Sequence, residues 1–247
     1  MCNIPVEGPF WLDDHDVNFF PPIDYALEEP NGLLCVGGDL SPERLLAAYR
    51  YSLFPWFNDD QPILWWSPNP RAVLLPADIH ISRSLRKAIR KKKYRITFDQ
   101  CFTDVVSACA EPRPYEANTW ISDEIRRAYT QLHQLGYAHS VEAWQGEQLM
   151  GGLYGIALGK VFFGESMFSR ATDSSKIAFV YLTRQLQQWG FQLIDCQVAS
   201  EHLTSLGAID IDRNQFIDLL DQHSEPAIQR PAPWYFDQDF DPLKIND

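Results

Sequence analysis

Long apolar runs, paired cysteines and metal-ligand spacings are missing from this sequence. Apolar runs such as residues 63–66 are far shorter than the roughly 20 residues that span a bilayer, so no membrane helix is expected. The five cysteines include no Cys-x-x-Cys pair and the six histidines no His-x-x-x-His spacing, so we expect neither disulfides nor a metal site. The first residues lack the basic and apolar segments of a secretory signal, which predicts a cytoplasmic protein.

The composition excludes several classes of non-globular protein. The 247 residues are 45% hydrophobic and 22% charged, and the 13 glycines and 17 prolines are scattered along the chain. These values exclude collagen, coiled coils and extended disorder. A chain of this length buries about three quarters of its unfolded surface, which is enough for a core without metals or disulfides.

Positive charge is scarce overall but concentrated in one stretch. The formal net charge is −12, which disfavours nucleic acid as a partner because Lys and Arg make the contacts to phosphate. Residues 79–98, however, contain no acidic residue and 8 of the 21 positive charges, so the rest of the chain sums to −20. Ser82 is a suitable N-cap for a short helix that buries Leu85, Ala88 and Ile89. The opposite side of this helix carries four basic residues: Arg83, Arg86, Lys87 and Arg90.

Two interpretations of this basic side remain open. It is either an ordinary solvated face or a patch that binds the phosphate backbone of a nucleic acid. The concentration of cations within an acidic protein favours the second interpretation.

The chain divides near residue 70, where Pro68 and Pro70 form a natural boundary. Residues 1–28 lack a sustained period and predict an irregular arm, followed by a short apolar strand, a Gly-Gly turn and a helix that begins after Ser41. Residues 54–66 contain three of the eight tryptophans, which either pack in the core or provide platforms on which an unpaired base stacks.

The pattern of residues after the boundary near residue 70 predicts more regular structure. The patterns indicate a helix over 122–135, three antiparallel strands over 139–144, 147–154 and 160–166, a helix over 174–189, a strand over 193–198, and short helices over 201–206 and 213–221. We therefore predict an α+β protein with a small N-terminal α/β domain (1–69) and a larger acyltransferase-like domain (70–247) of the GNAT type, with a mostly antiparallel sheet flanked by helices. The Gly-rich pyrophosphate motif of CoA-dependent acetyltransferases is missing, so CoA is not the expected acyl donor.

Four blocks carry a resemblance to a known family. They are EPNGLL (29–34) with GGDLS (37–41), FPWF (54–57) with WWSP (65–68), GGLYG (151–155) with FGESMFS (163–169), and LIDCQV (193–198). Together they resemble the leucyl/phenylalanyl-tRNA–protein transferases over about residues 20–225. The resemblance implies a cofactor-free enzyme that moves Leu, Phe or less readily Met from aminoacyl-tRNA to the α-amine of proteins beginning with Arg or Lys. Such products are marked for degradation.

The resemblance also implies roles for individual residues. Alternation along the strand 193–198 puts Asp195 and Gln197 on one face, where they form either a structural hydrogen-bonding pair or, as the resemblance implies, the catalytic pair that manages the proton of the attacking amine. The resemblance places Glu165 opposite the basic residue of the acceptor. It assigns Leu153, Phe179, Leu182 and Ile194 to the pocket for the aminoacyl side chain, and Trp56 and Trp120, with Tyr49 and Tyr129 nearby, to the terminal adenine.

Two other functions fit parts of the sequence. One is a CoA-dependent amine N-acetyltransferase, which the order of elements allows and the missing pyrophosphate motif opposes. The other is a non-catalytic module that binds tRNA, which the basic helix and the tryptophans alone would equally support.

Overall fold

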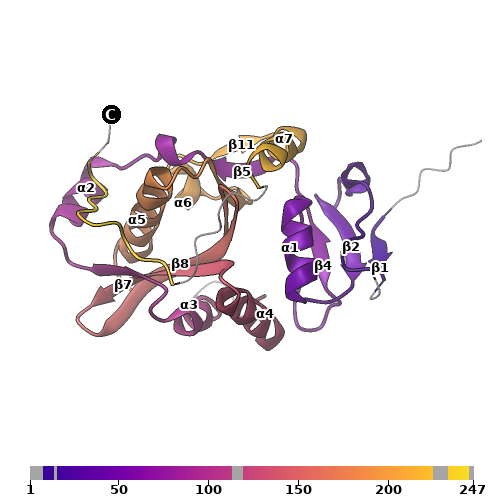
Figure 1. Ribbon diagram of the computed structural model, residues 1–247, viewed down its shortest axis with the longest axis horizontal. Coiled ribbons are helices and arrows are strands. Elements are labelled where there is room, and N and C mark those ends of the chain that lie inside the picture. Colours follow the sequence, from indigo (N-terminus) through magenta and orange to yellow (C-terminus); the bar gives the residue numbers. More distant parts are fainter. Residues whose placement is uncertain (1–7, 14–15, 113–118, 225–232, 245–247) are drawn as a thin grey trace, which may run out of the picture.

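The part of the chain that the computed structural model describes has two β-sheets, one formed by residues up to Trp66 and the other by residues from Arg71 onward (Figure 1). The structure describes residues 8–13, 16–112, 119–224 and 233–244. Residues 1–7 and 14–15 of the expected arm lie outside these ranges. No helix in the described ranges is long and apolar enough to cross a membrane.

The smaller sheet has the strand order β1-β2-β4-β3. Its strands are β1 (Phe10–Leu12), β2 (Leu33–Gly37), β3 (Phe54–Pro55) and β4 (Leu64–Trp66). Strand β1 pairs in parallel with β2, so the prediction of a wholly irregular arm over 1–28 is wrong at these three residues. A three-residue edge strand is too short to show an alternating pattern.

Helix α1 (Pro42–Arg50) connects the smaller sheet to the rest of the molecule. The side chain of Ser41 accepts a hydrogen bond from the amide of Arg44 and caps the helix as predicted. The helix lies between the two sheets (Figure 1). At its C-terminal end the ring of Tyr49 packs edge-on against Phe163 of the larger sheet, with ring centres 5.0 Å apart.

The larger sheet has the strand order β11-β5-β10-β9-β8-β7-β6. Its strands are β5 (Arg71–Leu74), β6 (Arg95–Phe98), β7 (Ala138–Gln145), β8 (Gln148–Leu158), β9 (Val161–Ser169), β10 (Leu193–Gln197) and β11 (Ile209–Ile211). Only β9 and β10 pair in parallel; the other neighbours in this described sheet are antiparallel. The predicted three-strand meander is confirmed as β7, β8 and β9, with each strand longer than expected.

Helices cover both faces of the larger sheet (Figure 1). Helices α2 (Arg83–Arg90) and α5 (Ser174–Gln188) bury one apolar cluster against it, and α3 (Phe102–Cys109) and α4 (Asp123–Gln134) bury another on the opposite face. The remaining elements are α6 (Glu201–Thr204), α7 (Arg213–His223) and the 3₁₀ helices η1 (Ile23–Tyr25) and η2 (Pro76–Asp78). The chain is thus a mixed α/β protein in which helices sandwich a central sheet.

Strands β9 and β10 pair over only a short length and then separate. Their parallel register runs from Leu193 opposite Val161 to Asp195 opposite Phe163. Beyond this point β9 continues to Ser169 and pairs only with β8. The separation opens a wedge in the middle of the sheet, at the C-terminal ends of two adjacent strands.

Candidate active site

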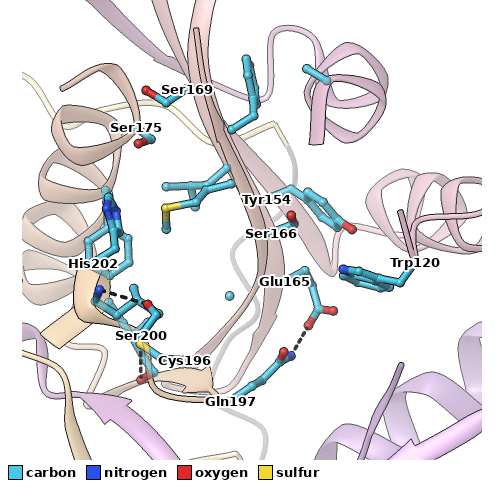
Figure 2. A pocket seen from close by; sticks show the side chains of 18 of the residues that line it. Trp120, Tyr154, Glu165, Ser166, Ser169, Ser175, Cys196, Gln197, Ser200 and His202 are labelled. Atoms are coloured by element: carbon cyan, nitrogen blue, oxygen red, sulfur yellow. Dashed lines mark hydrogen bonds between the residues drawn. The ribbon is translucent and has the colours of Figure 1, made fainter. Parts of the chain in front are cut away.

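A cavity of about 710 Å³ lies in the wedge between β9 and β10. Side chains from β8, β9, β10, α5 and α6 line it. Figure 2 shows Glu165, Gln197 and Trp120 on one side of the cavity and Ser169 and Ser175 on another. The cavity therefore has a carboxylate and an amide on one wall, which is the arrangement expected of a site that binds a polar or cationic group.

The apolar wall of the cavity contains three of the four residues predicted for the side-chain pocket. Leu153 from β8, Phe179 from α5 and Ile194 from β10 all line it, and each is almost wholly shielded from solvent. Leu182 lies one helical turn beyond Phe179, fully buried in the same apolar cluster. These side chains give the cavity an apolar surface that suits an aliphatic or aromatic group.

Glu165 is a buried carboxylate at the polar wall. Its Oε1 accepts a hydrogen bond from the side-chain amide of Gln197 at 3.1 Å, and its Oε2 accepts one from the hydroxyl of Tyr129 at 2.7 Å. Burial raises the pKa of Glu165 to about 7, although the hydrogen bonds from Tyr129 and Tyr49 oppose the rise. A carboxylic acid in this state changes its charge near neutral pH.

Asp195 is fully buried and forms an ion pair that the sequence did not reveal. Its two carboxylate oxygens accept hydrogen bonds from Nε and Nη2 of Arg71, at 2.8 and 2.6 Å. Neither side chain is exposed to solvent. The guanidinium also lies between the rings of Phe54 and Phe216, at 4.8 and 4.5 Å from their centres, and this stacking is typical of buried arginines.

Gln197 ends strand β10 in a left-handed conformation, with a φ of 63°. The register of β10 against β5 shifts between Asp195 and Gln197, so the predicted regular alternation is interrupted before Gln197. The strand itself ends at Gln197, one residue earlier than the predicted end at residue 198. The backbone amide of Gln197 donates a hydrogen bond to Oδ1 of Asp195 at 2.9 Å. This local turn directs the side chain of Gln197 toward Glu165.

The predicted adenine-binding residues lie in three different environments. Trp120 lines the cavity, whereas Trp56 is half-exposed beside Trp66, with ring centres 5.9 Å apart. Tyr49 and Tyr129 are fully buried, and their hydroxyl groups are hydrogen-bonded to each other at 2.5 Å. In this structure Tyr129 donates a hydrogen bond to Glu165, and Tyr49 is hydrogen-bonded to Tyr129. Of the four predicted aromatic residues, Trp120 lines the cavity.

The basic stretch forms a helix as predicted. Leu85 and Ile89 of α2 are buried, and the cap at Ser82 accepts from the amide of Leu85 at 3.2 Å. Three of the predicted basic residues, Arg83, Lys87 and Arg90, are exposed, and Arg86 is partly buried. The helix packs on α5. The pKa of Arg184 in α5 is lowered mainly by burial and, to a smaller extent, by the nearby positive charge of Arg86.

Sequence reasoning missed two residues of this region. The first is Arg71, which begins the short, buried strand β5. An arginine at the start of an apolar strand is a signal that could have been used, because a buried guanidinium requires an acidic partner elsewhere in the chain. His202 of α6 also lines the cavity, and burial lowers its pKa. Cys196 lines the cavity as well, but burial raises the pKa of its thiol, so it lacks the properties of a nucleophile.

Comparison with known proteins assigns the chain to a family of acyl-transferring enzymes. The sequence model described as "Leucyl/phenylalanyl-tRNA protein transferase" matches residues 73–221, and the model of that family's N-terminal domain matches residues 38–69. The chain therefore belongs to the leucyl/phenylalanyl-tRNA–protein transferase family.

Individual relatives of that name are similar over most of their length. The protein from Cellvibrio japonicus is 58% identical over 91% of this chain and 95% of its own. The protein from Ectopseudomonas mendocina is 60% identical over 86% of this chain and 94% of its own. The solved structure of L-PGS from Bacillus licheniformis covers 68% of this chain and 53% of its own, with 9% identity and a TM-score of 0.38, a likeness too weak to bear on the fold.

Proposed function

We propose that this protein transfers Leu or Phe, and less readily Met, from aminoacyl-tRNA to the α-amine of proteins that begin with Arg or Lys. The observation that carries this proposal is the wedge cavity, which combines an apolar wall with a buried carboxylate in a chain of this family. The neutral amine attacks the ester carbonyl, a C–N bond forms, and the C–O bond to the terminal ribose breaks. The proton lost by the amine ends on the released ribose hydroxyl.

The two walls of the cavity suit the two substrates. An aliphatic or aromatic side chain loses contact with water against Leu153, Phe179 and Ile194. The basic first residue of the acceptor has its partner in Glu165. An approaching cation favours the ionised form of this carboxylate and lowers its pKa from the raised value.

Asp195 and Gln197 are proposed to orient the attacking amine and its proton. An aminoacyl ester is already activated, so the enzyme needs no nucleophile of its own. Because Asp195 already accepts two hydrogen bonds from Arg71, its carboxylate is better suited to orienting Gln197 than to holding a proton itself. The ribose hydroxyl of the tRNA is then the final proton acceptor.

The tRNA is proposed to contact two further regions. The exposed cations of α2 suit the phosphate backbone, with which they interact irrespective of sequence. Trp120, at the cavity, and Trp56, which is half-exposed, are the aromatic residues proposed to stack on the terminal adenine. Aminoacyl-tRNA is used where translation takes place, so the same proposal assigns the reaction to the cytoplasm, where its products are marked for degradation.

We also propose that residues 1–69 form an N-terminal domain and residues 70–247 a GNAT-like transfer domain. The separate sheets on either side of residue 70 support this division. The parallel pair β9–β10, which separates within a mostly antiparallel sheet, supports the acyltransferase likeness.

A transfer assay tests the proposed function. The purified protein is incubated with radiolabelled Leu-tRNA and a peptide that begins with Arg, and label in the peptide is measured. The same peptide with an acetylated N-terminus is the control, because it has no free amine. Label in the free peptide alone supports the proposal, whereas tRNA binding without transfer would indicate a binding module, and acetylation of the peptide from acetyl-CoA would indicate an acetyltransferase.

A further inference from the structure

Arg71 connects strand β10 to the N-terminal layer, by which we mean the smaller sheet and helix α1 (residues 10–66). Its Nη1 donates to the backbone carbonyl of Ser52 at 3.1 Å, and its other two nitrogens hold both oxygens of Asp195. Asp195 in turn accepts a hydrogen bond from the backbone amide of Gln197. Because Gln197 is in a left-handed conformation, which a non-glycine residue seldom adopts, this hydrogen bond helps to hold an unfavourable backbone geometry.

A second line of hydrogen bonds returns from Gln197 to the same segment of the N-terminal layer. Gln197 donates to Glu165 and Tyr129 donates to Glu165, and the hydroxyl of Tyr129 also meets that of Tyr49. The amide of Ser52 donates to the carbonyl of Tyr49 at 3.2 Å. Together the hydrogen bonds form a closed ring, of which Glu165, Asp195 and Gln197 line the cavity.

We propose that Arg71 is a positioning residue for aminoacyl transfer, which acts through Asp195 to fix Gln197 and its contact with Glu165. This inference rests on the proposed function. Arg71 is fully buried and does not line the cavity, so its effect on the reaction is transmitted through Asp195 and Gln197. Its effect depends on the planar fork of the guanidinium, which holds two carboxylate oxygens in one plane.

The Arg71→Lys variant tests the role of the fork. Lysine keeps the positive charge beside Asp195 but does not form two parallel hydrogen bonds. We expect kcat for transfer from Leu-tRNA to an Arg-peptide to fall about 10- to 100-fold, because small displacements of catalytic groups have effects of this size. The KM for Leu-tRNA is expected to change by less than about twofold, because Arg71 lies away from the tRNA-binding helix α2.

Arg44→Lys is the matched control. Arg44 is also a fully buried arginine of the N-terminal layer, paired with Asp39 at 3.4 Å and donating to the carbonyl of Asp13. We expect this variant to retain kcat within about twofold of the wild type. Each kcat is measured well below the thermal midpoint of the variant, so that loss of folded protein does not contribute.

A double-variant cycle separates positioning from a general loss of order. If Arg71 acts through Asp195, Arg71→Lys added to Asp195→Asn lowers kcat no further than Asp195→Asn alone. Independent, multiplying losses would overturn the inference, as would a normal kcat in Arg71→Lys or equal losses in Arg71→Lys and Arg44→Lys. Absence of transfer by the wild-type protein would instead refute the proposed function.

Discussion

Replacing Glu165 by Gln tests the consequence of burying a carboxylate in the cavity. In the folded protein, burial raises the pKa of Glu165 to about 7, whereas a glutamate in an unfolded chain has a pKa of about 4.3. Between these values the folded state holds a proton that the unfolded state has lost. The stability of the wild type therefore falls as the pH rises from about 4 to about 7, and this contribution stays lost above that range.

Glutamine carries no charge, so the Glu165→Gln variant lacks this pH dependence. Integrating the two proton-binding curves gives an expected gain in the free energy of unfolding of about 1 kcal/mol at pH 5 and about 4 kcal/mol at pH 8. The variant can keep both hydrogen bonds if its carbonyl oxygen accepts from Gln197 and its amide donates to the hydroxyl of Tyr129. The gain is thus an electrostatic effect with little change in packing.

Urea denaturation at pH 5 and pH 8 measures the gain, and the KM for an Arg-peptide at pH 8 measures the loss of the ionic partner. Glu142→Gln is the control, because Glu142 is likewise buried and has a raised pKa but contacts Ser140 and Thr97 instead of lining the cavity. We expect only Glu165→Gln to raise the KM for the peptide. A stability difference that is the same at both pH values would refute the reasoning.

Four other sets of variants test the remaining parts of the site. Changing the four basic residues of α2 to Glu should raise the KM for aminoacyl-tRNA and flatten its salt dependence, because phosphate contacts are lost; equal losses with an aminoacyl-adenosine donor would contradict this. Phe179→Ala should shift the donor preference from Leu toward bulkier side chains, because each buried contact that a side chain lacks costs about 1–3 kcal/mol in discrimination. An unchanged Leu-to-Phe ratio would indicate that Phe179 is a core residue without a role in the pocket. Asp195→Ala leaves Arg71 buried without a counter-ion, so urea denaturation should show a loss of about 3–5 kcal/mol, and a stable variant would contradict the strength assigned to this pair. Asp195→Asn and Gln197→Ala should each lower kcat by about 10²- to 10⁴-fold, and the double variant by much less than the product.

Local signals in the sequence predicted the elements that carry their own capping and periodicity. Ser82 caps α2 as expected, and the helix predicted over 122–135 begins after a cap at Ser122. The apolar periods of α2 and α4 identify their buried faces. Strands β5 and β11 were not predicted. They have only four and three residues and derive their stability from neighbours in the larger sheet, a contribution that local pattern does not contain.

The candidate site was predictable only as far as local pattern and family resemblance reach. Asp195 and Gln197 follow from the strand pattern and the resemblance, but Arg71 lies 124 positions from Asp195 in the sequence. From the sequence alone, Asp195→Ala is expected to leave the thermal midpoint nearly unchanged. The buried ion pair with Arg71 leads us to expect a large loss of stability instead, because a buried charge that loses its partner is strongly destabilising.

The cover that the N-terminal layer places over Arg71 has an electrostatic consequence. Phe54 and the carbonyl of Ser52 lie on the guanidinium, and without them its side chain would face water. In water the high dielectric constant weakens the attraction between two charges several-fold relative to a protein interior. The small sheet and its helix thus act as an insulating layer. A fragment that begins at residue 70 would retain every residue of the cavity wall, but it would lose the low-dielectric surroundings in which Arg71 and Asp195 are paired.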